Sequence, residues 1–306
     1  MLYYNIALKA FCLSVFLLLT PLASADSKRS SEKPLLITSI KPLAIIAKSA
    51  FKDNVVVDYV MPAALSPHDV VLKLSDIRKF ADADLVLWIG PEFEVRSAKH
   101  FAKVDAEKRV TAMDLLDTSK NHHSEHSEHS EHSEHSEHSE HGHDDHHGDI
   151  DPHIWLSPKI VEQLIAVLSE RLGVKADSVF DEQARQKTEL LLENAKLGNY
   201  IVHHQGFGYF IEEFNLQEGL SIRDMLGQQQ GAKTQYSLRL EGEKRGVSCV
   251  FVEPQHGQKD AVGIAADLGV PTKTIDILAV ASKDGLLSYK SYIYGLAKQF
   301  SSCFEK

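Results

Sequence analysis

The stretch Leu35–Val60, LLITSIKPLAIIAKSAFKDNVVVDYV, sets the pattern that decides the fold. Its apolar run LLITS predicts a strand, and KPLAIIAKSAF predicts a helix entered through Pro42, because proline fits the first turn of a helix. VVVDYV then predicts a second strand. Since parallel strands need a helical crossover between them, this order indicates an α/β protein built on a parallel sheet.

The same alternation continues along the chain and is interrupted once. The helical segment LSDIRKFADA, the strands DLVLWIG and RVTAM and an amphipathic helix from Pro158 to Gly173 complete a first half. After a polar helical segment, the strands YIVHH, SCVFVEP and PTKTID alternate with helices up to YKSYIYGLAKQF. We therefore predict two lobes, residues 33–173 and 198–306, joined by a connecting helix at 174–197, with a cleft between them.

Residues 1–25 have the features of a signal peptide. Lys9 precedes an apolar run from Ala10 to Leu19, and Ala23-Ser24-Ala25 is the small-x-small pattern of a cleavage site. The run is short for a membrane span, so an uncleaved anchor is the weaker alternative. We expect export to the periplasm and cleavage after Ala25.

Charge and cysteine content narrow the class of protein further. A formal net charge of −10 argues against nucleic acid or an acidic membrane surface as a partner. After cleavage only Cys249 and Cys303 remain. In an exported chain the simplest reading is one disulfide, with two inert buried thiols as the alternative.

A histidine-rich tract occupies residues 121–148, and it includes six Ser-Glu-His triplets. It contains no apolar side chain that could form a core, so we predict a disordered loop within the first lobe. Imidazoles suit zinc, copper and nickel, and the glutamates attract cations. Because a disordered loop must be ordered each time it wraps an ion, we expect loose, accessory metal binding. A solvated linker without a role is the alternative. The histidines of this loop are His122, His123, His126, His129, His132, His135, His138, His141, His143, His146 and His147.

Three histidines outside the tract lie in loops that the alternation directs toward the cleft. His68 follows a predicted strand, His153 precedes the long amphipathic helix, and His204 lies at a strand-to-helix turn. Three neutral imidazoles and one oxygen make a tetrahedral zinc site. Asp276, after another predicted strand, could supply that oxygen directly or through a water.

The remaining histidines and the tryptophans receive structural interpretations. His203 adjoins His204, but successive strand residues point to opposite faces, so only His204 is expected to reach the metal. We expect His100 and His256 at the surface. Trp88 and Trp155 are expected in the core or the cleft wall.

Several motifs resemble one known family. SPHDVVLKLSDIRKFADADLVLWIGPEFE closely resembles the periplasmic solute-binding proteins of bacterial high-affinity zinc ABC importers. DPHIWLSP, HQGFGYF and CVFVEPQ match that family in the same order, as does the acidic His-rich tract before DPH. The resemblance runs from about Leu35 to Cys303.

The resemblance implies two α/β lobes bridged by one long, rigid helix, with a single metal held between them. It implies His68, His153 and His204 as zinc ligands and Asp276 as the fourth, sometimes water-mediated, carboxylate. Histidine at position 204, where manganese-binding relatives usually have glutamate, favours zinc. The pair Cys249 and Cys303 matches a disulfide found in part of the family.

This chain also departs from the family pattern in three places. His204-Gln205-Gly206 replaces the usual His-Asp-Ala, and a missing carboxylate there could weaken the orientation of the imidazole. ILAVASKDG replaces the usual Asp-Pro-Leu-Gly sequence after Asp276, and the connecting helix is shorter than is typical.

We therefore predict a monomeric, non-enzymatic protein that captures zinc and delivers it to the membrane permease of an ABC importer. A zinc hydrolase would need a glutamate placed as general base, as in His-Glu-x-x-His, and that spacing does not occur. Two further functions are compatible with the sequence: a metal buffer or chaperone acting through the tract, and import of manganese, nickel or copper.

Overall fold

The structure is a computed structural model that describes residues 32–116, 150–283 and 287–305. The predicted signal peptide and the histidine-rich tract lie outside the described residues. Over the ranges that are described, no helix has both the length and the apolar character needed to cross a membrane.

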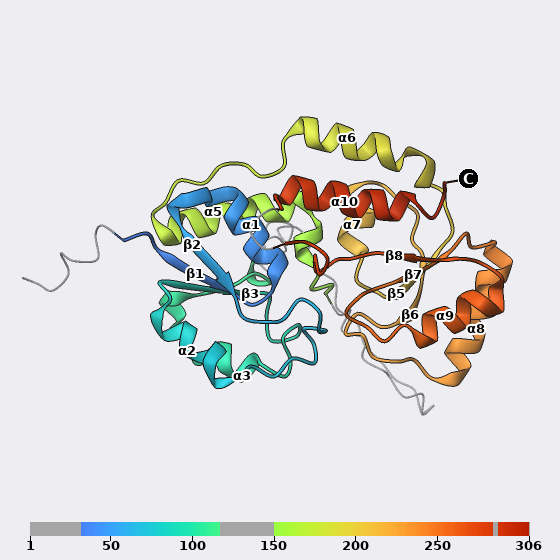
Figure 1. Ribbon diagram of the computed structural model, residues 1–306, viewed down its shortest axis with the longest axis horizontal. Coiled ribbons are helices and arrows are strands. Elements are labelled where there is room, and N and C mark those ends of the chain that lie inside the picture. The colour runs from blue at the N-terminus through green and yellow to red at the C-terminus, as the bar shows by residue number, and fades with distance from the viewer. Residues whose placement is uncertain (1–31, 117–149, 284–286, 306) are drawn as a thin grey trace, which may run out of the picture. The chain divides into compact units, whose positions relative to one another are not determined.

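The first half of the chain forms a parallel four-stranded sheet with the order β2-β1-β3-β4 (Figure 1). Its strands are β1 (Leu35–Thr38), β2 (Val56–Tyr59), β3 (Leu85–Trp88) and β4 (Arg109–Thr111). Helices α1 (Lys41–Phe51) and α5 (Pro158–Leu172) lie on one side of the sheet, and α2 (Leu74–Asp82) and α3 (Ala98–Phe101) on the other. The central strand β3 is buried along its whole length, as its continuous apolar sequence predicts.

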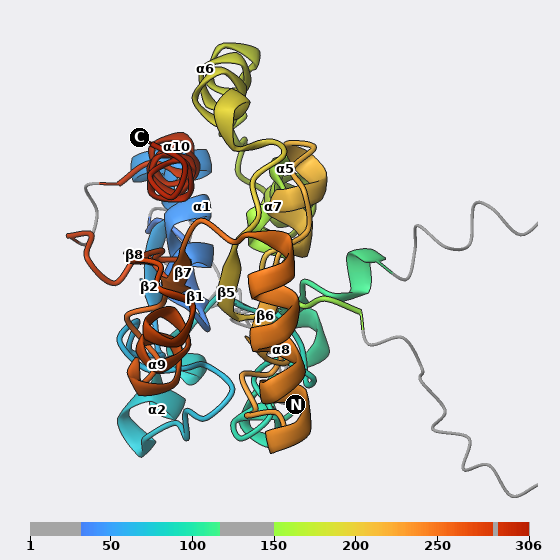
Figure 2. The same cartoon turned by 90° about the vertical axis from the view of Figure 1, so that its right-hand side faces the viewer.

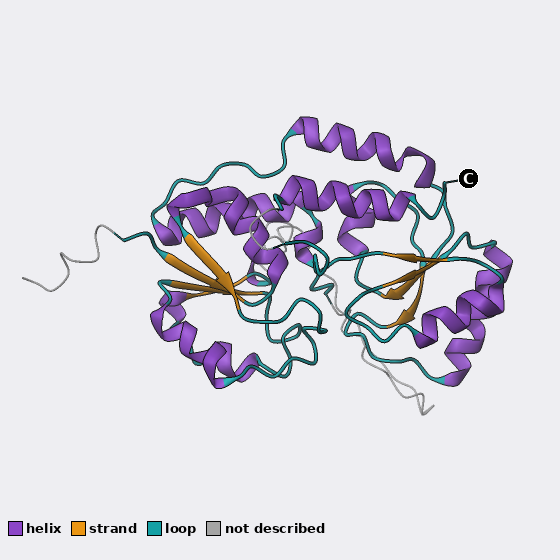
Figure 3. Cartoon of the chain, viewed as in Figure 1, coloured by secondary structure: helices purple, strands orange, loops and turns teal. Residues whose placement is uncertain are grey.

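The second half repeats this plan with the strand order β6-β5-β7-β8, again all parallel (Figures 2 and 3). Its strands are β5 (Ile201–His204), β6 (Leu220–Arg223), β7 (Val250–Val252) and β8 (Thr272–Thr274), and its helices are α7 (Gly208–Glu213), α8 (Ala232–Arg245), α9 (Lys259–Leu268) and α10 (Tyr289–Ser301). The two sheets confirm the predicted α/β class with two lobes. β6 and the first half of α8 were not predicted.

The strand order explains where a site can form. In each sheet the first strand in sequence lies between the second and the third, so successive crossovers leave it on opposite sides. Ligands of open parallel sheets bind beyond the carboxyl ends of the strands at such a switch point. In the second sheet that point lies between β5 and β7.

The entry of the chain into α5 shows how local sequence builds the first half. Ser157 accepts a hydrogen bond from the amide of Ile160 at 3.2 Å, and Pro158 occupies the first turn. Gly173, at φ 62°, ends the helix in the left-handed conformation. The Ser157 cap and Pro158 fix the start of α5 only a few residues after His153.

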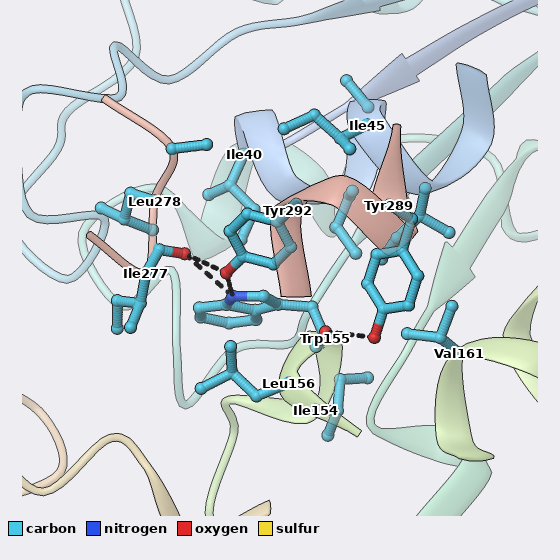
Figure 4. Close-up of a cluster of buried hydrophobic side chains, with 14 of the residues drawn as sticks. Ile40, Ile45, Ile154, Trp155, Leu156, Val161, Ile277, Leu278, Tyr289 and Tyr292 are labelled. Carbon is cyan, nitrogen blue, oxygen red and sulfur yellow. Dashed lines mark hydrogen bonds between the residues drawn. The ribbon is translucent and has the colours of Figure 1, made fainter. Parts of the chain in front are cut away.

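The C-terminal segment packs back against the first half (Figure 4). Trp155 is fully buried, and its indole Nε1 donates to the Ile277 carbonyl at 3.1 Å and to the Tyr292 hydroxyl at 3.2 Å. Tyr289 donates to the Trp155 carbonyl at 2.9 Å, and its own amide donates to Ser49 of α1 at 2.9 Å. One hydrophobic core cluster consequently includes residues from both halves of the chain.

The connection between the halves differs from the predicted helix at 174–197. Helix α6 covers only Glu182–Leu192, followed by a 3-10 turn at Glu193–Ala195. It begins there because Asp181 caps it, accepting from the amide of Ala184 at 2.8 Å. Helix α10 packs along α6, so two helices lie beside each other at this connection. The exact limits of the two lobes remain a prediction.

The predicted disulfide is present between Cys249 and Cys303, whose Cα atoms are 5.6 Å apart. It joins the residue before β7 to the turn after α10. The last turn of the chain is thus fixed to the centre of the second sheet.

Candidate metal centre

Each predicted histidine ligand is presented by a different segment near the strand ends. His204 is the last residue of β5, and His153 immediately precedes the 3-10 turn Ile154–Leu156. His68 lies in the loop between β2 and α2. All three are buried, with exposed fractions of 7% for His68, 1% for His153 and 1% for His204.

The three imidazoles converge on one point between the sheets. One ligand atom from each lies within 4.8 Å of the others, and the Nε2 atoms of His153 and His204 are 3.1 Å apart. Two nitrogens on a tetrahedral zinc ion would be about 3.3 Å apart, given Zn–N bonds of about 2.05 Å. His153 and His204 therefore stand close to ligating distance, and a ligand atom of His68 lies within 4.8 Å of both.

The other ring nitrogen of each histidine is held by an acceptor. The Nδ1 of His68 lies 3.0 Å from the Phe93 carbonyl, that of His153 lies 2.7 Å from Asp151 Oδ1, and that of His204 lies 2.5 Å from Glu253 Oε1. These partners place the proton on Nδ1, because a carbonyl or carboxylate can only accept. In a neutral ring held in this way Nε2 keeps a lone pair, as a metal ligand requires.

The protonation states suit a cation. Burial lowers the pKa of His68 to about 3, assisted by the neighbouring His153 and His204. Burial also lowers the pKa of His153, against the opposing effect of Asp151. Burial alone would raise the pKa of Glu253, but the charge and hydrogen bond of His204 outweigh it and hold that pKa below its usual range. Near neutral pH the site thus combines neutral His68 and His153 with an ionised Glu253.

Gly206 leaves room for the two closest nitrogens. A Cβ at this position would lie 2.4 Å from Nε2 of His204 and 2.9 Å from Nε2 of His153. Gly206 therefore lies directly against the converging rings.

Asp276, the predicted fourth ligand, is buried but does not join this group. Its carboxylate oxygens accept from the backbone amides of Val280 at 2.9 Å and Ala281 at 3.0 Å. Among the described residues, it belongs to neither cluster whose ligand atoms approach one another within 4.8 Å. Ligation by Asp276 remains a prediction.

Two expectations about neighbouring residues need correction. His256 is half-buried rather than fully solvated, and its ring centroid lies 5.2 Å from that of His204 and 5.1 Å from that of His203. The missing carboxylate after His204 does not leave the imidazole unheld, because Glu253 at the end of the adjacent strand β7 takes that role. Sequence reasoning missed both residues, although the ends of neighbouring parallel strands meet at one edge.

The remaining histidines and tryptophans lie largely as predicted. His203 points away from the three-histidine group, and its Nε2 lies 3.1 Å from Asp260 Oδ1. His100, expected at the surface, is half-buried on α3, as His256 is after β7. Trp88 is a core residue, and Trp155 packs with its ring 5.1 Å from His153, forming part of the wall behind the site.

A two-lobed α/β fold with buried histidines converging between its sheets defines a metal-binding protein of the solute-binding class. The family described as zinc-uptake complex component A, periplasmic (ZnuA), matches residues 36–196 and 180–303. The chain belongs to this family.

Curated relatives and solved structures agree with this assignment. The chain is 30% identical to the high-affinity zinc uptake system protein ZnuA of Yersinia pestis, over 88% of this chain and 91% of that protein. It is also 30% identical to the protein of the same name from Haemophilus influenzae, over 98% and 99% of the two chains. The fold is shared with a crystal structure of ZnuA (TM-score 0.61, 19% identity, 89% and 99% coverage) and with the periplasmic zinc-binding protein TroA of Treponema pallidum (TM-score 0.65, 16% identity, 90% and 100% coverage).

Proposed function

We propose that this protein captures zinc outside the inner membrane and delivers it to an ABC importer. The observation that carries this function is the convergence of three Nε2 atoms whose Nδ1 partners are already in place. His68, His153 and His204 are the proposed ligands. Three imidazoles favour zinc over manganese, which prefers oxygen ligands.

The fourth position is assigned to Asp276, either directly or through a water. Direct ligation would require its carboxylate to leave the amides of Val280 and Ala281. A water-mediated contact would not. The latter fits the arrangement better, because it keeps both backbone amides satisfied.

The setting of the site favours binding over catalysis. Asp151 and Glu253, the two carboxylates that touch the histidine ligands, are hydrogen-bonded to Nδ1 atoms and so act as positioning groups. We propose that the protein is not an enzyme, works in the periplasm as a monomer after removal of residues 1–25, and engages the importer permease rather than nucleic acid. The tract at 121–148 would collect zinc loosely and supply the buried site.

The deciding experiment measures zinc binding by competition against a chromophoric chelator. We expect the mature chain, with or without residues 121–148, to retain one tightly bound ion. His68→Ala should lose that ion in both versions, whereas His100→Ala, a matched histidine on α3, should keep it. Loss of tight binding on deletion of the tract alone would instead place the function in the tract.

A further inference from the structure

A second group of possible ligands lies beside the three histidines, at the turn Glu253–His256 between β7 and α9. One ligand atom from each of His204, Glu253 and His256 lies within 4.8 Å of the others. His204 belongs to both groups, since its ring centroid is 5.0 Å from that of His153 and 5.2 Å from that of His256.

Several side-chain polar atoms around this turn have no hydrogen-bond partner among the described residues. Within the described part of the chain, only three buried side-chain polar atoms have no hydrogen-bond partner, and two of them are His203 Nδ1 and Gln255 Oε1. Likewise, no described residue hydrogen-bonds to the ring of His256, whose ring is 5.1 Å from that of His203. Because a buried acceptor without a donor is costly, such a concentration indicates a missing cation or donor.

The electrostatics at the turn also suit a cation. The carboxylate of Glu253 is fully buried, and its Oε2 accepts from Gln255 Nε2 at 2.6 Å, which leaves lone pairs on both oxygens. The guanidinium of Arg223 forms an ion pair with Asp260 at 2.6 Å.

The two groups differ in access to solvent. His68, His153 and His204 are buried, whereas His256 is half-buried. The loop at Gly227, with φ +72°, passes close to both groups: a Cβ there would lie 3.2 Å from Cε1 of His256 and 3.9 Å from Cδ2 of His68. His256 is therefore the histidine of this cluster that an incoming ion can reach first.

We propose that His256 and Glu253 form a second, outer position for a zinc-class divalent cation, sharing His204 with the inner three-histidine site. This inference rests on the proposed function and adds a route: an ion held at His256 exchanges onto His204 and then closes the inner group. Because both positions use His204, they are occupied in sequence. The outer position should be weaker, since it has fewer fixed imidazoles.

The test is residue-resolved footprinting of the full chain with diethyl pyrocarbonate, at free zinc concentrations set by chelator buffers. Each histidine peptide is quantified by mass spectrometry, so the tract is read separately. In a His68→Ala/His153→Ala variant, His256 should still be protected by zinc, about tenfold when free zinc is ten times the dissociation constant. His100 serves as the internal control and should not respond.

Two outcomes would overturn the outer position. One is that zinc never slows modification of His256; the other is that protection vanishes when His68 and His153 are replaced, which would mean that closure of the inner site merely covers the ring. Neither outcome bears on the inner site, which fails only if the unaltered chain shows no tight zinc binding.

A kinetic measurement keeps the inference testable if the double variant does not fold. Zinc loading is followed by stopped-flow fluorescence of Trp155, which packs against His153. His256→Gln should load severalfold more slowly than the unaltered chain, and His100→Gln at the unaltered rate. Equal rates for the His256→Gln variant and the unaltered chain would refute the route through His256.

Discussion

Each of the three converging histidines takes its orientation from one hydrogen bond made by Nδ1, the ring nitrogen that faces away from the other two rings. The three acceptors come from different places: a backbone carbonyl at Phe93, a local carboxylate at Asp151 and a carboxylate on the neighbouring strand at Glu253. Such partners fix the tautomer and raise the basicity of the ligand nitrogen. Binding strength at the three-histidine site is consequently distributed over residues that are not ligands of that site.

Glu253→Gln tests this distribution. Glutamine keeps the shape but loses the charge that holds His204, so we expect zinc affinity to fall about 10- to 100-fold in chelator competition. Glu243→Gln, a matched change at an exposed position of α8, should leave affinity unaltered. An undiminished affinity in Glu253→Gln would show that the fold alone orients His204.

The sequence located His68, His153 and His204 because each follows or precedes a recognisable element. It did not locate Glu253 as the partner of His204. That pairing depends on β7 lying next to β5, and the order β6-β5-β7-β8 is a property of the folded sheet. Because β7 lies next to β5, the turn after β7 also brings His256 beside His204.

At the scale of elements, strong periodic patterns were predictable and weak ones were not. Strand β3 and helix α5 have continuous or clearly amphipathic apolar patterns. Helix α8 buries only Leu238 and Gly242 and exposes Tyr236 and Leu240, so its sequence has little apolar stripe to detect. Helix α6 is also mostly polar, and only its Asp181 cap marks where it begins.

The disulfide provides a prediction at this scale. Cys249 and Cys303 are separated by 54 residues, and a bond across that span stabilises by about 4 kcal/mol in the chain-entropy treatment. Cys249→Ser/Cys303→Ser should lower the free energy of unfolding by up to that amount in urea titrations. A variant as stable as the oxidised protein would contradict this expectation.

Helix α10 allows a sharper comparison between two of its tyrosines. The Tyr292 hydroxyl donates to the Ile277 carbonyl at 2.7 Å and accepts from the Trp155 indole at 3.2 Å, all buried. Tyr292→Phe should destabilise by about 1–2 kcal/mol, measured as a lower urea midpoint. Tyr294→Phe, on the exposed side of the same helix, should change stability by less than about 0.5 kcal/mol. Similar losses of stability in both variants would show that the buried Tyr292 hydroxyl contributes no more to the free energy of unfolding than the exposed Tyr294 hydroxyl.

For the whole molecule, the buried histidines predict how stability depends on pH. The pKa values of His68, His153, His203 and His256 are all lowered, chiefly by burial, to about 3 for His68 and about 4 for His256. Below the unfolded value of 6.5, the unfolded chain therefore binds protons that the folded chain does not. The metal-free protein should lose stability as pH falls from 6.5 toward 4, measured by urea denaturation at each pH.

Glu94 changes the pH dependence of stability in the opposite direction, because its pKa is raised rather than lowered. Burial raises its pKa to about 7 from 4.5, so the folded state holds a proton that the unfolded state releases, and this contribution is lost as pH rises from 4.5 to 7. Glu94→Gln should therefore make the loss of stability on acidification steeper. A flat pH profile in both proteins would mean that the buried histidines are protonated without unfolding.

The packing of the C-terminal segment against the first half of the chain affects the order in which the protein can fold. A chain emerges from the ribosome with its N-terminus first, and an N-terminal domain commonly folds before the rest is made. Here Trp155 finds its hydrogen-bond partners at Ile277 and Tyr292, which are synthesised more than a hundred residues later. The first half therefore cannot bury the indole of Trp155 until the segment that contains Ile277 and Tyr292 has been made and has packed against it.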